Sequence, residues 1–168
     1  MANTYSLISS KTVGAGGQSS IEFTSIPGTY TDLILKVSIR GTGTGSPNIS
    51  LDINGVSTGR TSQWIQGNGS TDTGYAFTSA DIATGNTTTQ TASIFGNTEM
   101  YFPNYASANS KGFHSESVQE NNNSVPTYTE LVGGFWSGTS AITSLKFYIT
   151  GQDIAQHSTA YLYGISNA

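Results

Sequence analysis

Residues 21–41 read IEFTSIPGTYTDLILKVSIRG and contain the clearest strand signal in the chain. Apolar and polar side chains alternate through residues 31–40, and this period of two predicts a half-buried β-strand. A second alternating run, residues 19–26, precedes it, and the Pro27-Gly28 pair between the two runs is a turn signal. We therefore expect two antiparallel strands here. The buried face of the second would carry Leu33, Leu35, Val37 and Ile39.

The outer face of the same predicted strand would carry Lys36 and Arg40, which are two of only six basic residues in the chain. Scarce charges gathered in one place raise the question of a functional site. Their spacing puts both on one polar face with Ser38, and Ile34 is the single apolar exception on that face. We interpret the face as a solvated or interface edge of a sheet.

Runs of strand length recur along the whole chain and are separated by turns rich in Gly, Asn and Ser. Asn54-Gly55 is the strongest hairpin signal, because a type I′ turn needs positive φ at both central residues. Its return strand would cover residues 56–60, and one helical turn is expected near residues 80–82. The other expected strands are residues 4–13, 48–53, 63–65, 75–77, 91–102, 112–119, 127–136, 142–150 and 159–165.

The number and spacing of these runs predict the fold class. They amount to roughly nine to eleven short strands at the spacing of about 8–12 residues that is typical of sandwiches and barrels. Strands do not alternate with helical patterns, which argues against a parallel α/β fold. The sequence thus predicts an all-β fold, an antiparallel jelly-roll-like β-sandwich in which residues 1–168 form a single domain.

The composition is unusually polar but is that of an ordered protein. Thr, Ser, Gly and Asn provide 80 of the 168 residues, and only 10% of the residues are charged. Disordered chains usually combine low hydrophobicity with high net charge and few aromatics. This chain has a formal net charge of only −4, and it contains 9 Tyr, 7 Phe and 2 Trp. The composition therefore indicates strands with polar outer faces joined by turns of Gly, Asn and Ser.

Charge and composition also argue against several kinds of partner. The six basic residues are scattered and the net charge is negative, which disfavours a nucleic-acid-binding surface. No apolar run is long enough to cross a membrane. The chain has no cysteine, so it can form neither a disulfide nor a thiolate metal site.

No motif for catalysis or cofactor binding is present in the sequence. The ten carboxylates show no spacing typical of a glycosidase pair, although neighbours across strands cannot be read from a sequence. His114 and His157 lack the sequence neighbours of a zinc site, and nothing marks either as part of a triad. We expect no enzyme activity, no cofactor and no metal site, with a two-carboxylate glycan hydrolase as a minor alternative.

Aromatic residues mark the candidate contact surfaces. Residues 159–165 are apolar on both faces, as expected for a strand inside a sheet or against a partner chain. Because Tyr and Trp are enriched at interfaces, the candidate oligomer or partner interface comprises Phe135, Trp136, Tyr161, Tyr163 and Ile165. Exposed aromatics can also stack on sugar rings. On that alternative the candidate glycan-stacking residues are Trp64, Tyr75, Tyr101, Tyr105 and Trp136.

Both ends of the chain resemble a group of small tailed-phage proteins from phages of marine bacteria and cyanobacteria. The segments that carry the resemblance are IEFTSIP (21–27), TYTDL (29–33), FWS (135–137), ITSL (142–145) and LYGI (162–165). Residues 41–130 match the group poorly. The resemblance implies a virion component with a jelly-roll-like fold that assembles as a homotrimer.

Within that group two roles are implied. The first is a capsid decoration or cement protein, which would bind the major capsid protein on the outer surface of the head and stabilise the shell. Residues 1–13 would then be an anchoring arm, or simply an edge strand. The alternative is a receptor- or carbohydrate-binding module of a tail fibre or spike, whose partner would be a host-surface glycan. Neither role needs a cofactor.

Overall fold

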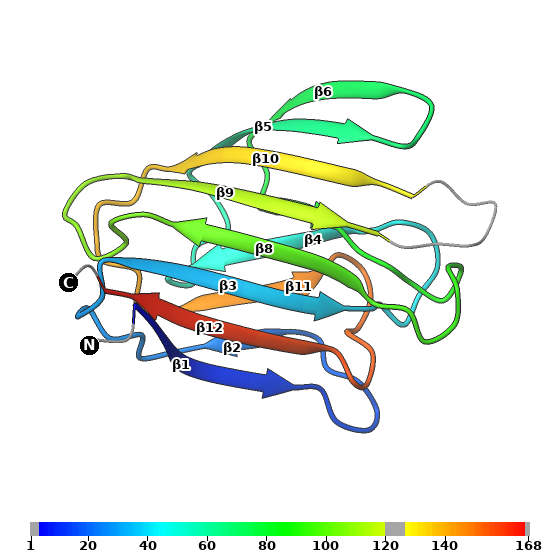
Figure 1. The fold of residues 1–168 in the computed structure, drawn as a ribbon, viewed down its shortest axis with the longest axis horizontal. Coiled ribbons are helices and arrows are strands. Elements are labelled where there is room, and N and C mark those ends of the chain that lie inside the picture. The colour runs from blue at the N-terminus through cyan, green and yellow to red at the C-terminus, as the bar shows by residue number, and fades with distance from the viewer. Residues whose placement is uncertain (1–3, 120–126, 167–168) are drawn as a thin grey trace.

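The computed structural model describes residues 4–119 and 127–166, and these contain twelve β-strands and no helix. The strands form two antiparallel sheets, and the smaller lies behind the larger in Figure 1. Across the larger sheet the order is β1 (Tyr5–Thr12), β12 (Thr159–Ile165), β3 (Asp32–Ile39), β8 (Gly96–Phe102), β9 (Lys111–Val118), β10 (Thr129–Trp136), β5 (Arg60–Gly67) and β6 (Asp72–Phe77). Across the smaller sheet it is β2 (Ile21–Phe23), β11 (Leu145–Ile149), β4 (Asn48–Ile53) and β7 (Asp81–Thr84). The predicted all-β sandwich is confirmed.

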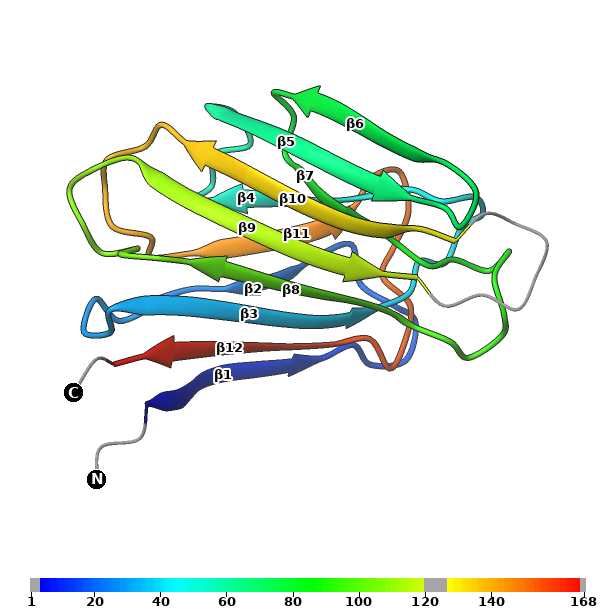
Figure 2. The same ribbon diagram turned by 45° about the horizontal axis from the view of Figure 1, so that its top comes forward.

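The connections between the sheets follow jelly-roll topology. If β5, β6, β9 and β10 are set aside, the eight remaining strands can be renumbered in chain order. In the new numbers, the strand order of the larger sheet is 1-8-3-6 and the strand order of the smaller sheet is 2-7-4-5. Two interlocked Greek keys produce this order in a jelly roll. The other four strands form the hairpins β9–β10 and β5–β6, which extend the larger sheet beyond β8 (Figure 2).

One continuous core fills the space between the inner faces of the two sheets. The period-two pattern of β3 determines its contribution, because alternate side chains of a strand point to the same face. Leu51 and Phe147 of the smaller sheet belong to the same buried cluster. The four β3 residues predicted for the core are all at most 5% exposed: Leu33, Leu35, Val37 and Ile39.

The outer face of β3 differs in part from the prediction. Lys36 is exposed there as expected, but Ile34 is only 5% exposed. Its register neighbours on the two flanking strands are Tyr163 and Tyr101. An apolar side chain between two tyrosines is shielded from water without entering the main core, which explains the exception in the pattern.

Arg40, predicted for the same face, is half-buried and is held by the chain beside it instead of standing free in solvent. It follows the last residue of β3, and its guanidinium group donates hydrogen bonds to the carbonyls of Thr91 and Ile94, each at 2.7 Å. Partial burial, which disfavours the charged form, lowers the pKa of Arg40. Arg40 therefore holds the connection between β7 and β8 against the end of β3.

Two local predictions between β4 and β8 were also wrong. Asn54 and Gly55 have φ values of 51° and 75°, as the predicted turn requires, but no return strand follows. Val56 only exchanges backbone hydrogen bonds with Ile53, at 2.9 and 3.1 Å, and the chain then crosses to the larger sheet as β5. The helical turn expected near residues 80–82 is the start of β7. Pairing with β4 has overridden the weak local signal there.

The two ends of the chain that carry the phage resemblance are in contact. β3 and β12 pair so that Leu33 lies opposite Gly164, and the Thr31 amide donates to the Ile165 carbonyl at 2.8 Å. The Tyr30 ring lies over Gly164 so closely that a Cβ atom on Gly164 would overlap it. The TYTDL and LYGI segments thus form one packing unit, which is a structural reason for both motifs.

Candidate functional site

Exposed apolar side chains gather on the outer face of the larger sheet, the face turned away from the smaller sheet. Nine large apolar residues are exposed in the described part of the chain, and all except Val56 and Tyr75 lie on this face. Those that do are Tyr5, Leu7, Ile65, Val118, Leu131, Phe135 and Tyr161. An apolar concentration of this kind marks an interaction surface.

The strand register aligns these side chains in rows across the sheet. Lys36 of β3 lies opposite Tyr161 of β12 on one side and opposite Glu99 of β8 on the other. Glu99 in turn faces Glu116 of β9. Beyond Glu116 the row continues through Leu131 of β10 to Ile65 of β5. One row therefore has a charged centre and apolar ends.

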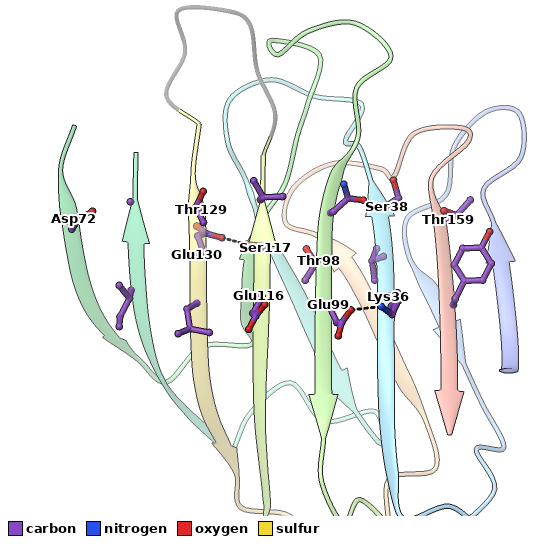
Figure 3. A pocket seen from close by; sticks show the side chains of 17 residues that line it. Lys36, Ser38, Asp72, Thr98, Glu99, Glu116, Ser117, Thr129, Glu130 and Thr159 are labelled. Carbon is purple, nitrogen blue, oxygen red and sulfur yellow. Dashed lines mark hydrogen bonds and ion pairs between the residues drawn. The ribbon is translucent and has the colours of Figure 1, made fainter. Parts of the chain in front are cut away.

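This row and the next one line an open groove of about 930 Å³, shown in Figure 3. The second row contributes Ser38, Asn97, Val118 and Thr129, and Asp72 stands at the β6 end. Because the groove runs across strands, its lining comes from seven of the eight strands of the sheet. The extension by the two hairpins supplies the half of the groove beyond β8.

Of the two glutamates at the centre of the groove, only Glu99 forms an ion pair within the described residues. The Lys36 Nζ atom lies 2.5 Å from Oε2 of Glu99, and both side chains are about half exposed. The hydrogen bond to Glu99 raises the pKa of Lys36. Glu116, directly opposite Glu99, has no ion pair in the described residues. Like charges directly opposite each other destabilise a sheet, so this arrangement suits a ligand with hydrogen-bond donors.

Under the groove lies a carboxylate that holds the two sheets together. Glu130 of β10 is 3% exposed and points inward. It accepts hydrogen bonds from the Thr84 amide at 2.7 Å, from Ser117 Oγ at 2.8 Å and from Gln66 Nε2 at 2.5 Å. The Thr84 hydroxyl donates to it as well. Since Thr84 belongs to β7, Glu130 connects the added strands to the smaller sheet.

Tyr101 is fixed at the other end of the outer face. Its hydroxyl donates to Oδ2 of Asp32 at 2.7 Å, and Oδ1 of Asp32 accepts from the Asn104 amide at 2.8 Å. The Tyr101 ring lies against His114, with centroids 5.3 Å apart. The hydrogen bond to Asp32, followed by burial, raises the pKa of Tyr101 to about 12.

This shift predicts a pH dependence. A tyrosine in the unfolded chain ionises near pH 10. In the folded protein Tyr101 keeps its proton until about pH 12. Its contribution to stability is therefore complete below pH 10 and is lost as the pH rises from 10 to 12. The tyrosinate absorbance of the protein minus that of Tyr101→Phe should show a midpoint near 12, and Asp32→Asn should lower it. A difference midpoint near 10 in the unaltered protein would contradict the hydrogen bond.

The edge of the sheet nearest the chain termini carries a second feature, which we call the edge patch. It consists of Tyr5, Leu7, Tyr161 and Tyr163. Tyr5 and Leu7 are 55% and 54% exposed on β1, and Tyr161 is 39% exposed on β12. Leu7 is the register partner of Tyr163. β1 is an edge strand of the larger sheet, and residues 5–12 pair with β12. They are therefore not a free anchoring arm. Residues 1–3 lie outside the described residues.

The predicted interface residues do not form one surface. Tyr161 and Tyr163 belong to the edge patch, but Ile165 is only 9% exposed. Trp136 points into the core and is 5% exposed, so it is not available to a partner. Phe135 is 49% exposed but lies on β10, four strands away from β12. The alternation of inner and outer side chains on β10 separates the two adjacent aromatics.

The predicted glycan-stacking residues are also not brought together. Tyr105 is fully buried and its hydroxyl donates to the Pro27 carbonyl, while Trp64 is 4% exposed. A buried ring has no free face for a sugar. Tyr101 is half-buried and held by Asp32, and Tyr75 lies near the opposite edge, on β6. These four residues, like Trp136, do not make a stacking platform.

The two glutamates at the centre of the groove were not identified from the sequence. Glu99 and Glu116 were two of ten carboxylates without special spacing, and only the β8–β9 register brings them together. The described residues hold no group of three or more His, Asp or Glu side chains suited to a metal ion. They also contain no helix of the length and apolarity needed to cross a membrane.

Comparisons with known proteins identify no relative of this chain. No protein-family model, no curated protein sequence and no solved structure matches the chain significantly.

Proposed function

We propose that this protein is a structural component of a tailed-phage virion, a capsid decoration or cement protein. It binds the outside of the head as a homotrimer and stabilises contacts between major capsid proteins. The role involves no chemical reaction and no cofactor. The observation that carries the proposal is the edge patch, an exposed apolar surface beside an edge strand that pairs on one side only within the described residues.

Two physical arguments support self-association through this patch. An edge strand presents free amide and carbonyl groups, and proteins normally protect such edges with charges, proline or bulges. β1 has a bulge between Leu7 and Ser9 and one lysine, Lys11, but its first half exposes Tyr5 and Leu7 to more than 50%. Because each side chain is only about half exposed, burying the rest in an interface contributes about 1 kcal/mol each, roughly half the value for a fully exposed side chain.

The resemblance of both chain ends to small phage proteins supports the location on a virion. The jelly roll agrees with it, since this topology is frequent in viral capsid proteins. Fold alone does not determine function, so the proposal depends on the patch and its partner.

The self-association is tested by the double substitution Tyr5→Ser with Leu7→Ser. We expect the unaltered protein to have three times the mass of the single chain in light scattering after size exclusion. The double variant should have the single-chain mass, because the apolar contribution of both side chains is lost. The matched control is Val56→Ser, which alters a 41% exposed residue outside the patch and should leave the trimer intact.

A single-chain mass for the unaltered protein at high concentration would contradict trimer formation in solution. A trimer that persists in the double variant would show that another surface mediates assembly. Thermal unfolding of each variant confirms that the substitutions leave the fold intact, as expected for exposed positions.

A further inference from the structure

We propose that the groove on the outer face of the larger sheet is a binding site for a linear oligosaccharide, either neutral or amine-bearing. The groove is a different surface from the aromatic residues predicted for glycan stacking. The proposal does not depend on whether the protein is a capsid decoration protein. Its central residues are Glu99, Glu116 and Asn97, with Tyr161 at one end and Leu131 and Ile65 at the other.

The shape of the groove suits an extended chain. It crosses seven strands from β12 to β6. Neighbouring strands are about 4.8 Å apart, so the groove extends roughly 29 Å across the sheet. This is much longer than one sugar ring, and its open side leaves room for a polymer to enter and leave. An extended ligand that follows the groove would contact side chains of every strand in turn.

The chemistry of the floor suits sugar hydroxyl groups. The carboxylates of Glu99 and Glu116 lie opposite each other, and each oxygen can accept hydrogen bonds from hydroxyls. The Asn97 amide, in the neighbouring row, can both donate and accept. Because Glu116 has no ion pair in the described residues, its acceptor capacity is free for a ligand.

The ends of the groove suit the apolar faces of sugar rings. Tyr161 is 39% exposed at the β12 end and offers part of its ring as a stacking surface. At the other end Leu131 and Ile65 are register partners, 46% and 61% exposed. Apolar contacts at both ends with polar contacts in the middle match a chain of rings that have polar edges and apolar faces.

The same residues disfavour a protein partner at the centre of the groove. Protein interfaces are depleted of charged residues in their buried core. Covering Glu116 with a dry apolar surface would leave a carboxylate without a partner, which is costly. A sugar supplies hydroxyl donors in a wet site, where bridging water is tolerated.

The charge balance determines the class of sugar. The outward-facing charged residues of the lining are Lys36 against Asp72, Glu99 and Glu116, so the groove is acidic. Sulfated or uronic-acid chains would be repelled at short range. Neutral chains and chains with amino groups would not be repelled. The preference should therefore be for glucose, xylose or glucosamine polymers over heparin.

The test uses the full chain and calorimetric titration with linear oligosaccharides of glucose, xylose and glucosamine, and with heparin fragments as the anionic probe. We expect measurable binding of at least one neutral or amino chain and none of heparin. Glu116→Gln should weaken binding by about tenfold or more, since it removes a charged acceptor. The matched control Glu22→Gln, an exposed carboxylate on the smaller sheet, should change nothing.

Three results would overturn the proposal. They are an absence of binding for all neutral and amino chains, tighter binding of heparin, and binding that Glu116→Gln does not weaken. A lysine-rich peptide is tested in parallel, and groove binding by the peptide alone would replace the sugar with a basic protein partner. Tyr161 belongs to both the edge patch and the groove, so each titration is repeated with the Tyr5→Ser, Leu7→Ser variant, in which the edge patch is disrupted. Binding by either form supports the groove, and failure of both forms to bind overturns it, whatever the mass of the unaltered protein.

Discussion

Replacing Gly164 with alanine is expected to destabilise the protein by about 3 kcal/mol, at the upper end of the cost of overpacking a core. Gly164 lies in β12, and an added Cβ would overlap the atoms at the base of the Tyr30 ring. The base of the ring moves aside only by rotation about χ1 or by a backbone shift, and the core packed around Tyr30 opposes both. The measurement is the free energy of unfolding from urea denaturation, taken at constant slope.

Gly133→Ala is the matched control, because a Cβ there would meet no atom within 4 Å and Gly133 also lies in a strand. We expect a change within about 0.5 kcal/mol. In a double-mutant cycle, Tyr30→Ala should relieve much of the cost of Gly164→Ala, which would show that the two positions are coupled. Equal stabilities for Gly164→Ala and Gly133→Ala would contradict the close contact between Tyr30 and β12.

Replacing Glu130 with alanine is expected to cost about 3 kcal/mol of stability. The substitution leaves the amide of Thr84 and the hydroxyl of Ser117 without their acceptor in a buried setting. Hydrogen bonds to a charged group contribute about 1.5–3 kcal/mol, and unsatisfied donors add a desolvation cost. Chemical denaturation measures the total loss.

The matched control is Glu116→Ala on the adjacent strand, where the carboxylate is exposed and has no ion pair among the residues that the structure describes, and we expect little loss there. Glu130→Gln keeps the shape and one acceptor oxygen, so its loss should lie between the two. Equal stabilities for Glu130→Ala and Glu116→Ala would contradict the role of the Glu130 carboxylate in connecting β10 to β7.

The fold class could be read from the sequence because period-two alternation identifies strands and their buried faces. The predicted ranges 48–53 and 159–165 coincide with β4 and β12. Where local pattern and tertiary pairing disagreed, pairing decided the outcome. Thus Asn54-Gly55 formed its turn, but β5 joined the other sheet, because the larger sheet offers it β10 as a partner.

The groove could not be read from the sequence, because it depends on register between strands that are distant in the chain. Lys36 and Glu99 are 63 positions apart, and their ion pair requires β3 and β8 to be neighbours. For a related reason, the sequence could not show which aromatic residues lie on the surface. Trp136 and Phe135 are adjacent in sequence but point to opposite faces of β10, so composition alone could not separate a core ring from an exposed one.

The central claim, that the protein decorates a phage head, is tested most directly by its copy number in purified virions, measured by quantitative mass spectrometry against the major capsid protein. The account predicts a copy number of the same order as that of the major capsid protein, because a trimer that reinforces the shell repeats with the capsid lattice. A copy number as low as that of a tail component, or the absence of the chain from purified particles, would contradict it.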